Sequence, residues 1–169
     1  MPLFQPHFHF QRIYDIPVTF WQEKRITAIL LDVDNTLATH NNPQPHEEAL
    51  TWLELQKQSG VRLMILSNNC KKRVEPFAQS LKVEYIASAA KPFPGRLRQA
   101  LKQLGVRPEE TALIGDQLFT DILCGRLAGC LSVLVDPFQP EHHAFFRFKR
   151  WLERNLLGRR KNEKKEGKR

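Results

Sequence analysis

Two aspartates, Asp32 and Asp34, come directly after the apolar run ITAILL at residues 26–31. Such a run predicts a buried strand, so both carboxylates would emerge where that strand leaves its sheet. Burying one carboxylate without compensation is unfavourable, and two neighbouring carboxylates also repel each other. The pair therefore indicates a cation at the end of the strand, unless Asp34 and Asn35 only form a solvated Asx turn.

The elements that must position this pair alternate regularly along the chain. The predicted strands lie at residues 26–32, 61–66, 84–87, 111–115 and 131–135. The predicted helices lie at residues 46–59, 73–81, 95–105 and 117–129, the second being interrupted by Pro76. The strands are almost wholly apolar, which is typical of strands covered on both faces. Strict alternation predicts an α/β, three-layer, Rossmann-like fold with a central, mostly parallel sheet and helices on both faces.

Polar side chains follow three more of these strands. Ser67 and Asn68 follow the second strand, Lys91 follows the third, and Asp116 and Asp121 follow the fourth. Each has an ordinary explanation taken alone: Ser67 as a helix cap, Lys91 as a solvated loop residue, Asp121 as an acidic residue near a helix start. Because open α/β sheets bind ligands beyond the carboxyl ends of their strands, the set taken together predicts one shared site.

These residues resemble the motifs of the haloacid dehalogenase superfamily of phosphohydrolases. The matching stretches are DVDNT at 32–36, Ser67, Lys91 and GDQLFTD at 115–121. More narrowly, LLDVDNTLATHNN, ILSNNCKKRV, AAKPFPG, IGDQLFTDIL and the preceding FQRIYDI resemble the small YqeG-like phosphatases. Those proteins are relatives of the mitochondrial phosphatases that act on phosphatidylglycerophosphate.

The resemblance implies phosphomonoester hydrolysis through an aspartyl-phosphate. Asp32 would be the nucleophile, and Asp34 would protonate the leaving oxygen and then activate water. Mg²⁺ suits this chemistry because it is a hard cation held by carboxylates and substrate oxygens. The expected metal ligands are Asp32, Asp34 through its backbone carbonyl, and Asp116.

The remaining motif residues would support that reaction. Lys91 would offset the crowded carboxylates and the charge of the transferring phosphoryl group. Ser67 and Asn68 would hold phosphate oxygens, together with Lys91. Thr36 would be a local hydrogen-bonding partner, and Asp121 would either contact the metal through water or hold Lys91.

The spacing of the motifs also bears on the kind of substrate. The intervals from Asp32 to Ser67 and from Ser67 to Lys91 leave room for one helix and one strand each, so no cap domain is expected. An open site needs a large substrate, a membrane surface or an oligomer partner to exclude water. The resemblance to relatives of phosphatidylglycerophosphate phosphatases, together with the absent cap, makes the dephosphorylation of phosphatidylglycerophosphate to phosphatidylglycerol the leading prediction.

The formal net charge of +8 lies entirely in residues 147–169, which contain eleven Lys and Arg but three Glu. We expect four parts: an aromatic-rich extension at 1–25, the phosphatase core at 26–140, a basic amphipathic helix at 141–158 and a disordered basic tail at 159–169. Through residues 142–169 the chain could bind an anionic membrane, or the helix could dock on its own core.

Two alternative functions stay open. The first is hydrolysis of a soluble sugar or nucleotide phosphate, with an oligomer partner closing the open site. The second belongs to another class: an RNA- or ribosome-associated binding protein that uses the basic tail, although the core lacks a second basic patch. Without a signal peptide or a long apolar run, a cytoplasmic protein is expected, peripheral on the inner membrane face if the tail binds lipid.

Overall fold

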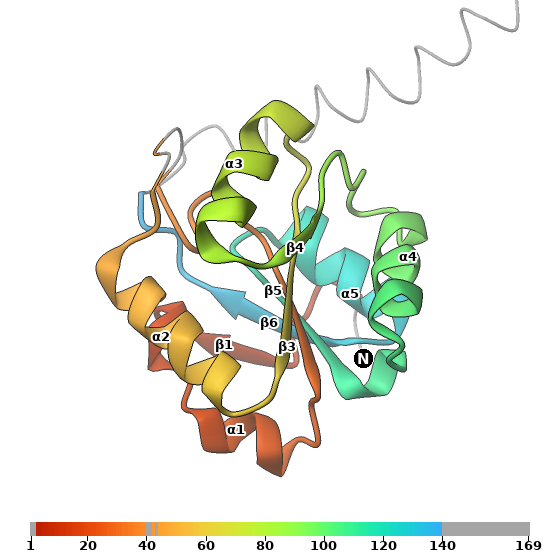
Figure 1. The fold of residues 1–169 in the computed structure, drawn as a ribbon. Coiled ribbons are helices and arrows are strands. Elements are labelled where there is room, and N and C mark those ends of the chain that lie inside the picture. The colour runs from red at the N-terminus through yellow and green to blue at the C-terminus, as the bar shows by residue number, and fades with distance from the viewer. Residues whose placement is uncertain (1–2, 40–41, 43, 140–169) are drawn as a thin grey trace, which may run out of the picture. The chain divides into compact units, whose positions relative to one another are not determined.

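The computed structural model describes residues 3–39, 42 and 44–139 (Figure 1). A single sheet of six parallel strands forms the centre, in the order β1-β6-β5-β2-β3-β4. The strands are β1 Phe8–Phe10, β2 Ala28–Leu31, β3 Arg62–Leu66, β4 Glu84–Ile86, β5 Thr111–Gly115 and β6 Leu131–Val135. The predicted fold class is confirmed, and every strand pair in the described part of the chain is parallel.

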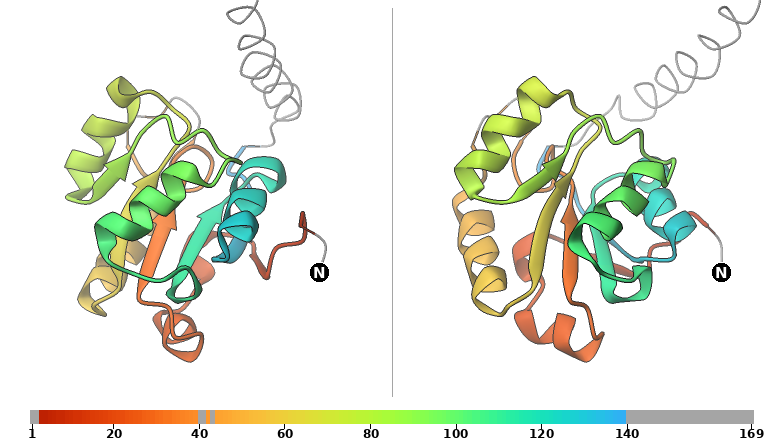
Figure 2. Two further views of the ribbon diagram at one scale, coloured as in Figure 1. Left: turned by 90° about the vertical axis from the view of Figure 1, so that its right-hand side faces the viewer. Right: turned by 45° about the vertical axis from the view of Figure 1, so that its right-hand side comes forward.

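Helices cover both faces of the sheet, as Figure 2 shows. The helices are α1 Val18–Glu23, α2 Glu47–Gln58, α3 Lys71–Leu81, α4 Gly95–Leu104 and α5 Leu123–Ala128. Short 3-10 turns lie at η1 Ile13–Asp15 and η2 Pro108–Glu110, and a π-helical turn, η3, spans Leu118–Ile122. The helix predicted at 117–129 thus divides into η3 and α5, and α3 accommodates Pro76 in its interior.

Alternate residues of the strands feed two separate cores. On one face Ile29 and Leu31 of β2 pack with side chains of α1, α2 and α3, including Trp52 and Phe77. On the other face the intervening Leu30 packs with side chains of α4 and α5. Because β2 is buried on both faces, its residues are apolar without alternation, and the first exit for a polar side chain is at its carboxyl end.

The first strand was not predicted, because the segment 1–25 was interpreted as an extension preceding the core. In the structure Phe8 and Phe10 pair with Val133 and Val135 of β6, which makes β1 an edge strand of the same sheet. Phe20 of α1 packs edge-on against both phenylalanine rings, with centroids 5.0 and 5.4 Å away. The aromatic residues of this segment therefore complete the fold.

The chain order places the strand ends that carry polar motifs next to one another. From β2 the chain continues outward through β3 and β4, and it then crosses to β5 and β6 on the other side of β2. This reversal beside β2 is where open α/β sheets form their binding crevice. In the described residues α2 is the only helix between β2 and β3, and α3 the only one between β3 and β4, so neither connection holds a cap domain.

The predictions for residues 141–158 and 159–169, and for membrane binding through 142–169, lie outside the described residues. Within the described ranges, no helix combines the length and the apolar character that crossing a bilayer requires.

Candidate active site

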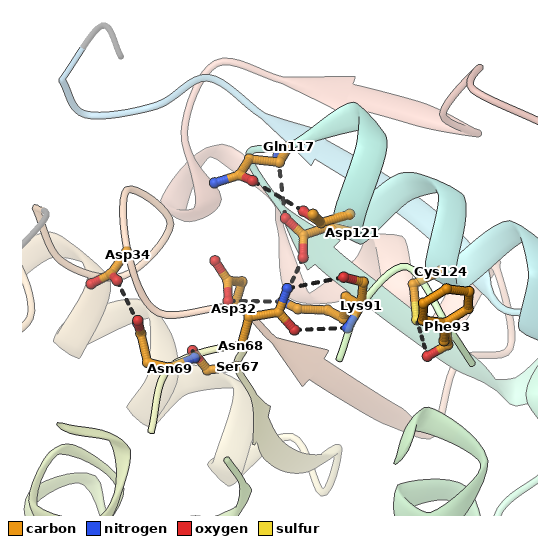
Figure 3. Close-up of polar contacts among 11 residues, drawn as sticks. Asp32, Asp34, Ser67, Asn68, Asn69, Lys91, Phe93, Gln117, Asp121 and Cys124 are labelled. Atoms are coloured by element: carbon orange, nitrogen blue, oxygen red, sulfur yellow. Dashed lines mark hydrogen bonds and ion pairs between the residues drawn. The ribbon is translucent and has the colours of Figure 1, made fainter. Parts of the chain in front are cut away.

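Lys91 is the centre of a buried ion-pair network at the carboxyl ends of the strands (Figure 3). Its ammonium donates to Asp32 Oδ1 at 2.8 Å and to Asp121 Oδ1 at 2.5 Å. The three residues are 2%, 7% and 1% exposed, respectively, although they come from three different strand ends. Lys91 is therefore a fixed counter-charge within the site, and the second option for Asp121, that it holds Lys91, is observed.

Burial governs the protonation of this network. Burial raises the pKa of Asp32 to about 7; Lys91 opposes the shift, whereas Asp121 and Asp34 add to it. Burial lowers the pKa of Lys91, but Asp121 and Asp32 raise it by more, so the net shift is upward. Lys91 thus stays charged at neutral pH. Asp32 is only partly ionised there, because Lys91 does not fully offset the effects of burial and of the neighbouring carboxylates.

Asp116 completes an acidic cluster with Asp32 and Asp121. One carboxylate oxygen from each residue lies within 4.8 Å of the other two. When all three are ionised, the carboxylates carry three negative charges and Lys91 offsets one of them, which leaves two negative charges uncompensated. An oxygen-only donor set with this charge suits a hard divalent cation.

Both carboxylate oxygens of Asp121 accept hydrogen bonds from the protein. Its Oδ1 accepts from Lys91, and its Oδ2 accepts the backbone N–H of Gln117 at 3.2 Å. A cation that contacted Asp121 directly would compete with these hydrogen bonds.

The carboxylate of Asp34 turns away from Lys91 and toward α3. Asn69 Nδ2 donates to Asp34 Oδ2 at 2.5 Å, and Arg73 Nη2 donates to Asp34 Oδ1 at 3.2 Å. A tight turn holds Asp34 in this place: Asn35 adopts a left-handed conformation (φ 60°), which asparagine tolerates better than most residues, and its N–H donates to Ala38. Asp34 thus lies two positions after Asp32 in sequence, but its two side-chain donors differ from the Lys91 ammonium that contacts Asp32.

Neither Asn69 nor Arg73 was among the predicted site residues. The signal that could have found them is the spacing: Asn69 follows Ser67 and Asn68 directly, and Arg73 lies four positions on, in the first turn of α3. Asn69 lies just before α3 and Arg73 in its first turn, so one segment brings both side chains to the same carboxylate.

The polar residues after β3 hold the loop that carries Lys91. Asn68, predicted to contact phosphate, uses both side-chain polar atoms on the backbone of Lys91: its Oδ1 accepts the Lys91 N–H at 2.7 Å, and its Nδ2 donates to the Lys91 carbonyl at 3.1 Å. The Ser67 hydroxyl is buried and accepts the N–H of Asn69 at 3.3 Å. Both residues lie at the site, but the Asn68 side chain positions Lys91 in this structure.

The expectation for Thr36 is met only by its backbone. Its N–H donates to the carbonyl of Val33 at 3.3 Å, within the turn that follows β2. Thr36 is only 1% exposed, and its hydroxyl has no hydrogen-bond partner among the described residues.

Gly115 is a further residue that the sequence reasoning did not single out. A Cβ at this position, the last of β5, would overlap the carboxyl group of Asp121. The absence of a side chain therefore lets Asp121 reach back from η3 to Lys91. The π-helical turn supports the same approach, because the N–H groups of Asp121 and Ile122 both donate to the carbonyl of Gln117.

Comparison with known proteins agrees with this geometry. The family described as mitochondrial PGP phosphatase matches residues 1–137. The chain is 32% identical to the probable phosphatase YqeG of Bacillus subtilis, over 91% of this chain and 90% of that protein. It is 31% identical to the phosphoglycolate phosphatase of Pasteurella multocida, over 48% of this chain and 40% of that protein.

A solved structure shows the same fold at lower identity. The 4-nitrophenylphosphatase of Thermotoga maritima superposes with a TM-score of 0.57 at 15% identity, covering 73% of this chain and 91% of that one. The resemblance to the haloacid dehalogenase superfamily is confirmed, and the chain is a phosphoric monoester hydrolase. With its matched region covering the whole sheet and every residue of the site, the chain belongs to the mitochondrial PGP phosphatase family.

Proposed function

We propose that this phosphatase converts phosphatidylglycerophosphate to phosphatidylglycerol through an aspartyl-phosphate on Asp32. The observation that carries the chemistry is the placement of Asp32 beside Lys91, Asp121 and Asp116 at the reversal point of the sheet. In this arrangement Asp32 would attack an incoming phosphate while fixed charges surround it.

The reaction has two steps in this proposal. In the first, Asp32 attacks phosphorus, the bond from phosphorus to the glycerol oxygen breaks, and Asp34 gives its proton to that oxygen. In the second, water attacks the phosphorus of the aspartyl-phosphate while Asp34 takes a proton from it, and the bond to Asp32 breaks to release phosphate. Ser67 and neighbouring backbone N–H groups would hold the phosphate oxygens throughout.

The acidic cluster fits Mg²⁺, because its donors are all carboxylate oxygens and its charge is only partly offset by Lys91. Asp32 and Asp116 would hold the ion, with the Asp34 carbonyl as a further ligand. Bound there, Mg²⁺ would neutralise the repulsion between Asp32 and the phosphate and polarise the phosphoryl oxygens.

Exposed apolar side chains support a lipid substrate. Phe93 is 48% exposed two positions after Lys91, and Phe119 is 38% exposed three positions after Asp116. The ring of Phe4, itself 48% exposed, lies with its centroid 5.3 Å from that of Phe119. Large exposed apolar groups on the segments that carry Lys91 and Asp116 are suited to acyl chains or a membrane surface.

The decisive assay measures phosphate release from phosphatidylglycerophosphate in mixed micelles with Mg²⁺, comparing the natural protein with Asp32→Asn. We expect turnover by the natural protein and a loss of roughly 10³-fold or more in the variant, because no nucleophile remains. Equal rates for the two proteins would refute the role of Asp32. Turnover of soluble phosphoesters without turnover of the lipid would refute the substrate alone.

The apolar residues are tested by Phe93→Ser combined with Phe119→Ser. We expect a slower reaction on the micellar lipid and an unchanged rate on 4-nitrophenyl phosphate. Leu55→Ser is the matched control. Leu55 is 50% exposed, but it lies in the last turn of α2, shortly before the amino end of β3, whereas the active site lies at the carboxyl ends of the strands.

A soluble sugar or nucleotide phosphate is the second candidate substrate. The partial match to a phosphoglycolate phosphatase supports a small soluble phosphate ester in general, without distinguishing a sugar from a nucleotide. A panel of soluble phosphoesters run beside the lipid, with the same Asp32→Asn control, separates the two.

A further inference from the structure

The Asp34 carboxylate accepts hydrogen bonds from two side chains, Asn69 and Arg73, that have no role in the two steps of the proposed reaction. Asn69 Nδ2 lies 2.5 Å from Asp34 Oδ2, and Arg73 Nη2 lies 3.2 Å from Asp34 Oδ1. Figure 3 shows Asp34 turned toward Asn69 and separate from the cluster around Lys91. Each carboxylate oxygen thus has one of these donors, and a proton or a substrate atom at either oxygen competes with that donor.

Arg73 is the exchangeable member of this group. Its side chain is 23% exposed, and its guanidinium also donates to the carbonyl of Asn42 at 2.6 Å and lies 5.7 Å from the ring centroid of Phe77. The planar guanidinium matches a phosphate group with paired hydrogen bonds, which a lysine ammonium does not. A partly exposed arginine beside Asp34 is therefore able to exchange a carboxylate for a phosphate.

The position of Asp34 decides which part of a substrate meets Arg73. The group that protonates the leaving oxygen has to lie beside that oxygen, so the leaving group departs past Asp34. Arg73 contacts the Asp34 carboxylate at 3.2 Å and is partly exposed, so an anion attached to a leaving group that passes Asp34 comes within reach of Arg73.

We propose that Arg73 recognises a phosphodiester carried on the leaving group, and that it exchanges Asp34 for this anion and so frees Asp34 to act at the leaving oxygen. This inference rests on the proposed function, because it takes Asp34 as the acid and base of the reaction. The feature of the substrate that Arg73 selects is a second phosphate, one glycerol unit away from the phosphomonoester that is cleaved. The lipid chains take no part in it.

Two soluble substrates test the inference without a membrane surface. Glycerophosphoglycerol phosphate carries both the phosphomonoester and the phosphodiester, whereas glycerol 3-phosphate carries the phosphomonoester alone. We expect the natural protein to have the higher kcat/KM on the first. We expect Arg73→Gln to lower that value roughly 10- to 100-fold, as for the loss of a hydrogen bond to a charged group, and to change the value for glycerol 3-phosphate by a clearly smaller factor, which reports only the loss of its contact with Asp34.

The matched control is Lys72→Gln, which removes the same charge from the neighbouring, exposed position of α3. We expect it to leave the ratio of the two kcat/KM values unchanged, and Arg73→Lys to restore only part of that ratio. Glycerophosphoglycerol, which lacks the phosphomonoester, should inhibit the natural protein and inhibit Arg73→Gln more weakly.

The outcomes separate the inference from the proposed function. If Arg73→Gln lowers activity on both substrates equally, Arg73 only positions Asp34, and the inference is wrong. If Lys72→Gln changes the ratio as much as Arg73→Gln does, general charge accounts for the effect, and the inference is again wrong. If the natural protein releases phosphate from neither substrate nor from the lipid, the proposed function itself fails.

Discussion

The two aspartates of the DVDNT motif belong to two groups of ion pairs, and these groups differ in burial. Lys91 with Asp32 and Asp121, which we call the inner pair or inner site, is almost fully enclosed, and these side chains are 2%, 10% and 1% exposed. Arg73 with Asp34, which we call the outer pair, is partly open to solvent, and these side chains are 23% and 13% exposed. A buried pair cannot be separated without leaving a charge stranded, whereas a partly open pair exchanges partners with water or ligand. Asp32 therefore has a permanent counter-charge in Lys91, whereas Asp34 has a replaceable one in Arg73.

The largest effect is expected from removing the buried ammonium. Lys91→Met leaves Asp32 and Asp121 buried without their common partner, and we expect the free energy of unfolding to fall by about 3–5 kcal/mol. The upward pKa shift of Lys91 means that its contribution is fully present below the ordinary lysine pKa and is lost only in alkali. Urea unfolding at pH 7 measures the change.

Lys102→Met is the control for that variant, since Lys102 is an exposed lysine of α4. Its free energy of unfolding should change by no more than about 0.5 kcal/mol. A similarly small change in Lys91→Met would contradict the view that the inner pair is fixed.

The nucleophile itself is expected to destabilise the metal-free protein. Because the pKa of Asp32 is raised to about 7, the folded state binds this proton more tightly than the unfolded state does, and stability from this group falls as pH rises from about 4 to 7. We expect Asp32→Asn to raise the free energy of unfolding in EDTA at pH 8 by about 1–3 kcal/mol, and by little at pH 4. Unfolding curves of both proteins across this pH range measure the difference.

Adding Mg²⁺ provides the control, because the ion would stabilise the natural protein more than the variant and so reduce or reverse the difference. If Asp32→Asn is the less stable protein in EDTA at pH 8, burial does not dominate the energetics of Asp32.

The contact between Gly115 and Asp121 tests how rigid the inner pair is. Gly115→Ala places a methyl group where the Asp121 carboxyl group lies, and we expect a loss of about 1–3 kcal/mol as that side chain is displaced from Lys91. Gly95→Ala is the matched control, because a Cβ there meets nothing within 4 Å. Equal thermal stability of the two variants would show that Asp121 adjusts freely.

The inner site was more predictable from sequence than the outer one, for a physical reason. Parallel strands end at one edge of a sheet, so Asp32, Lys91 and Asp116 could be brought together from strand pattern alone. The direction of the Asp34 side chain depends on competition among donors, which no period in the sequence encodes, and Arg73 was therefore missed.

The same reasoning applies to the first strand and to Asn68. The three residues Phe8–Phe10 are too few to show a strand period, and only pairing with β6 defines them as β1. The amide of Asn68 could serve either a phosphate or a backbone, and the choice follows from where the Lys91 loop passes. Elements defined by distant partners were the ones that the sequence left open.

The smallest effect is expected at the outer pair, and it sharpens the comparison most. A double-mutant cycle with Asp34→Asn and Arg73→Gln should give a coupling of about 0.2–1 kcal/mol in the free energy of unfolding, because water competes for both partners. The corresponding cycle with Asp121→Asn and Lys91→Met should give a larger value. Raising the salt concentration should reduce the outer coupling and leave the inner one nearly unchanged, since buried pairs are screened much less. Equal couplings with equal salt dependence would remove the distinction between a fixed and a replaceable counter-charge, and with it the reason to expect Arg73 to exchange partners.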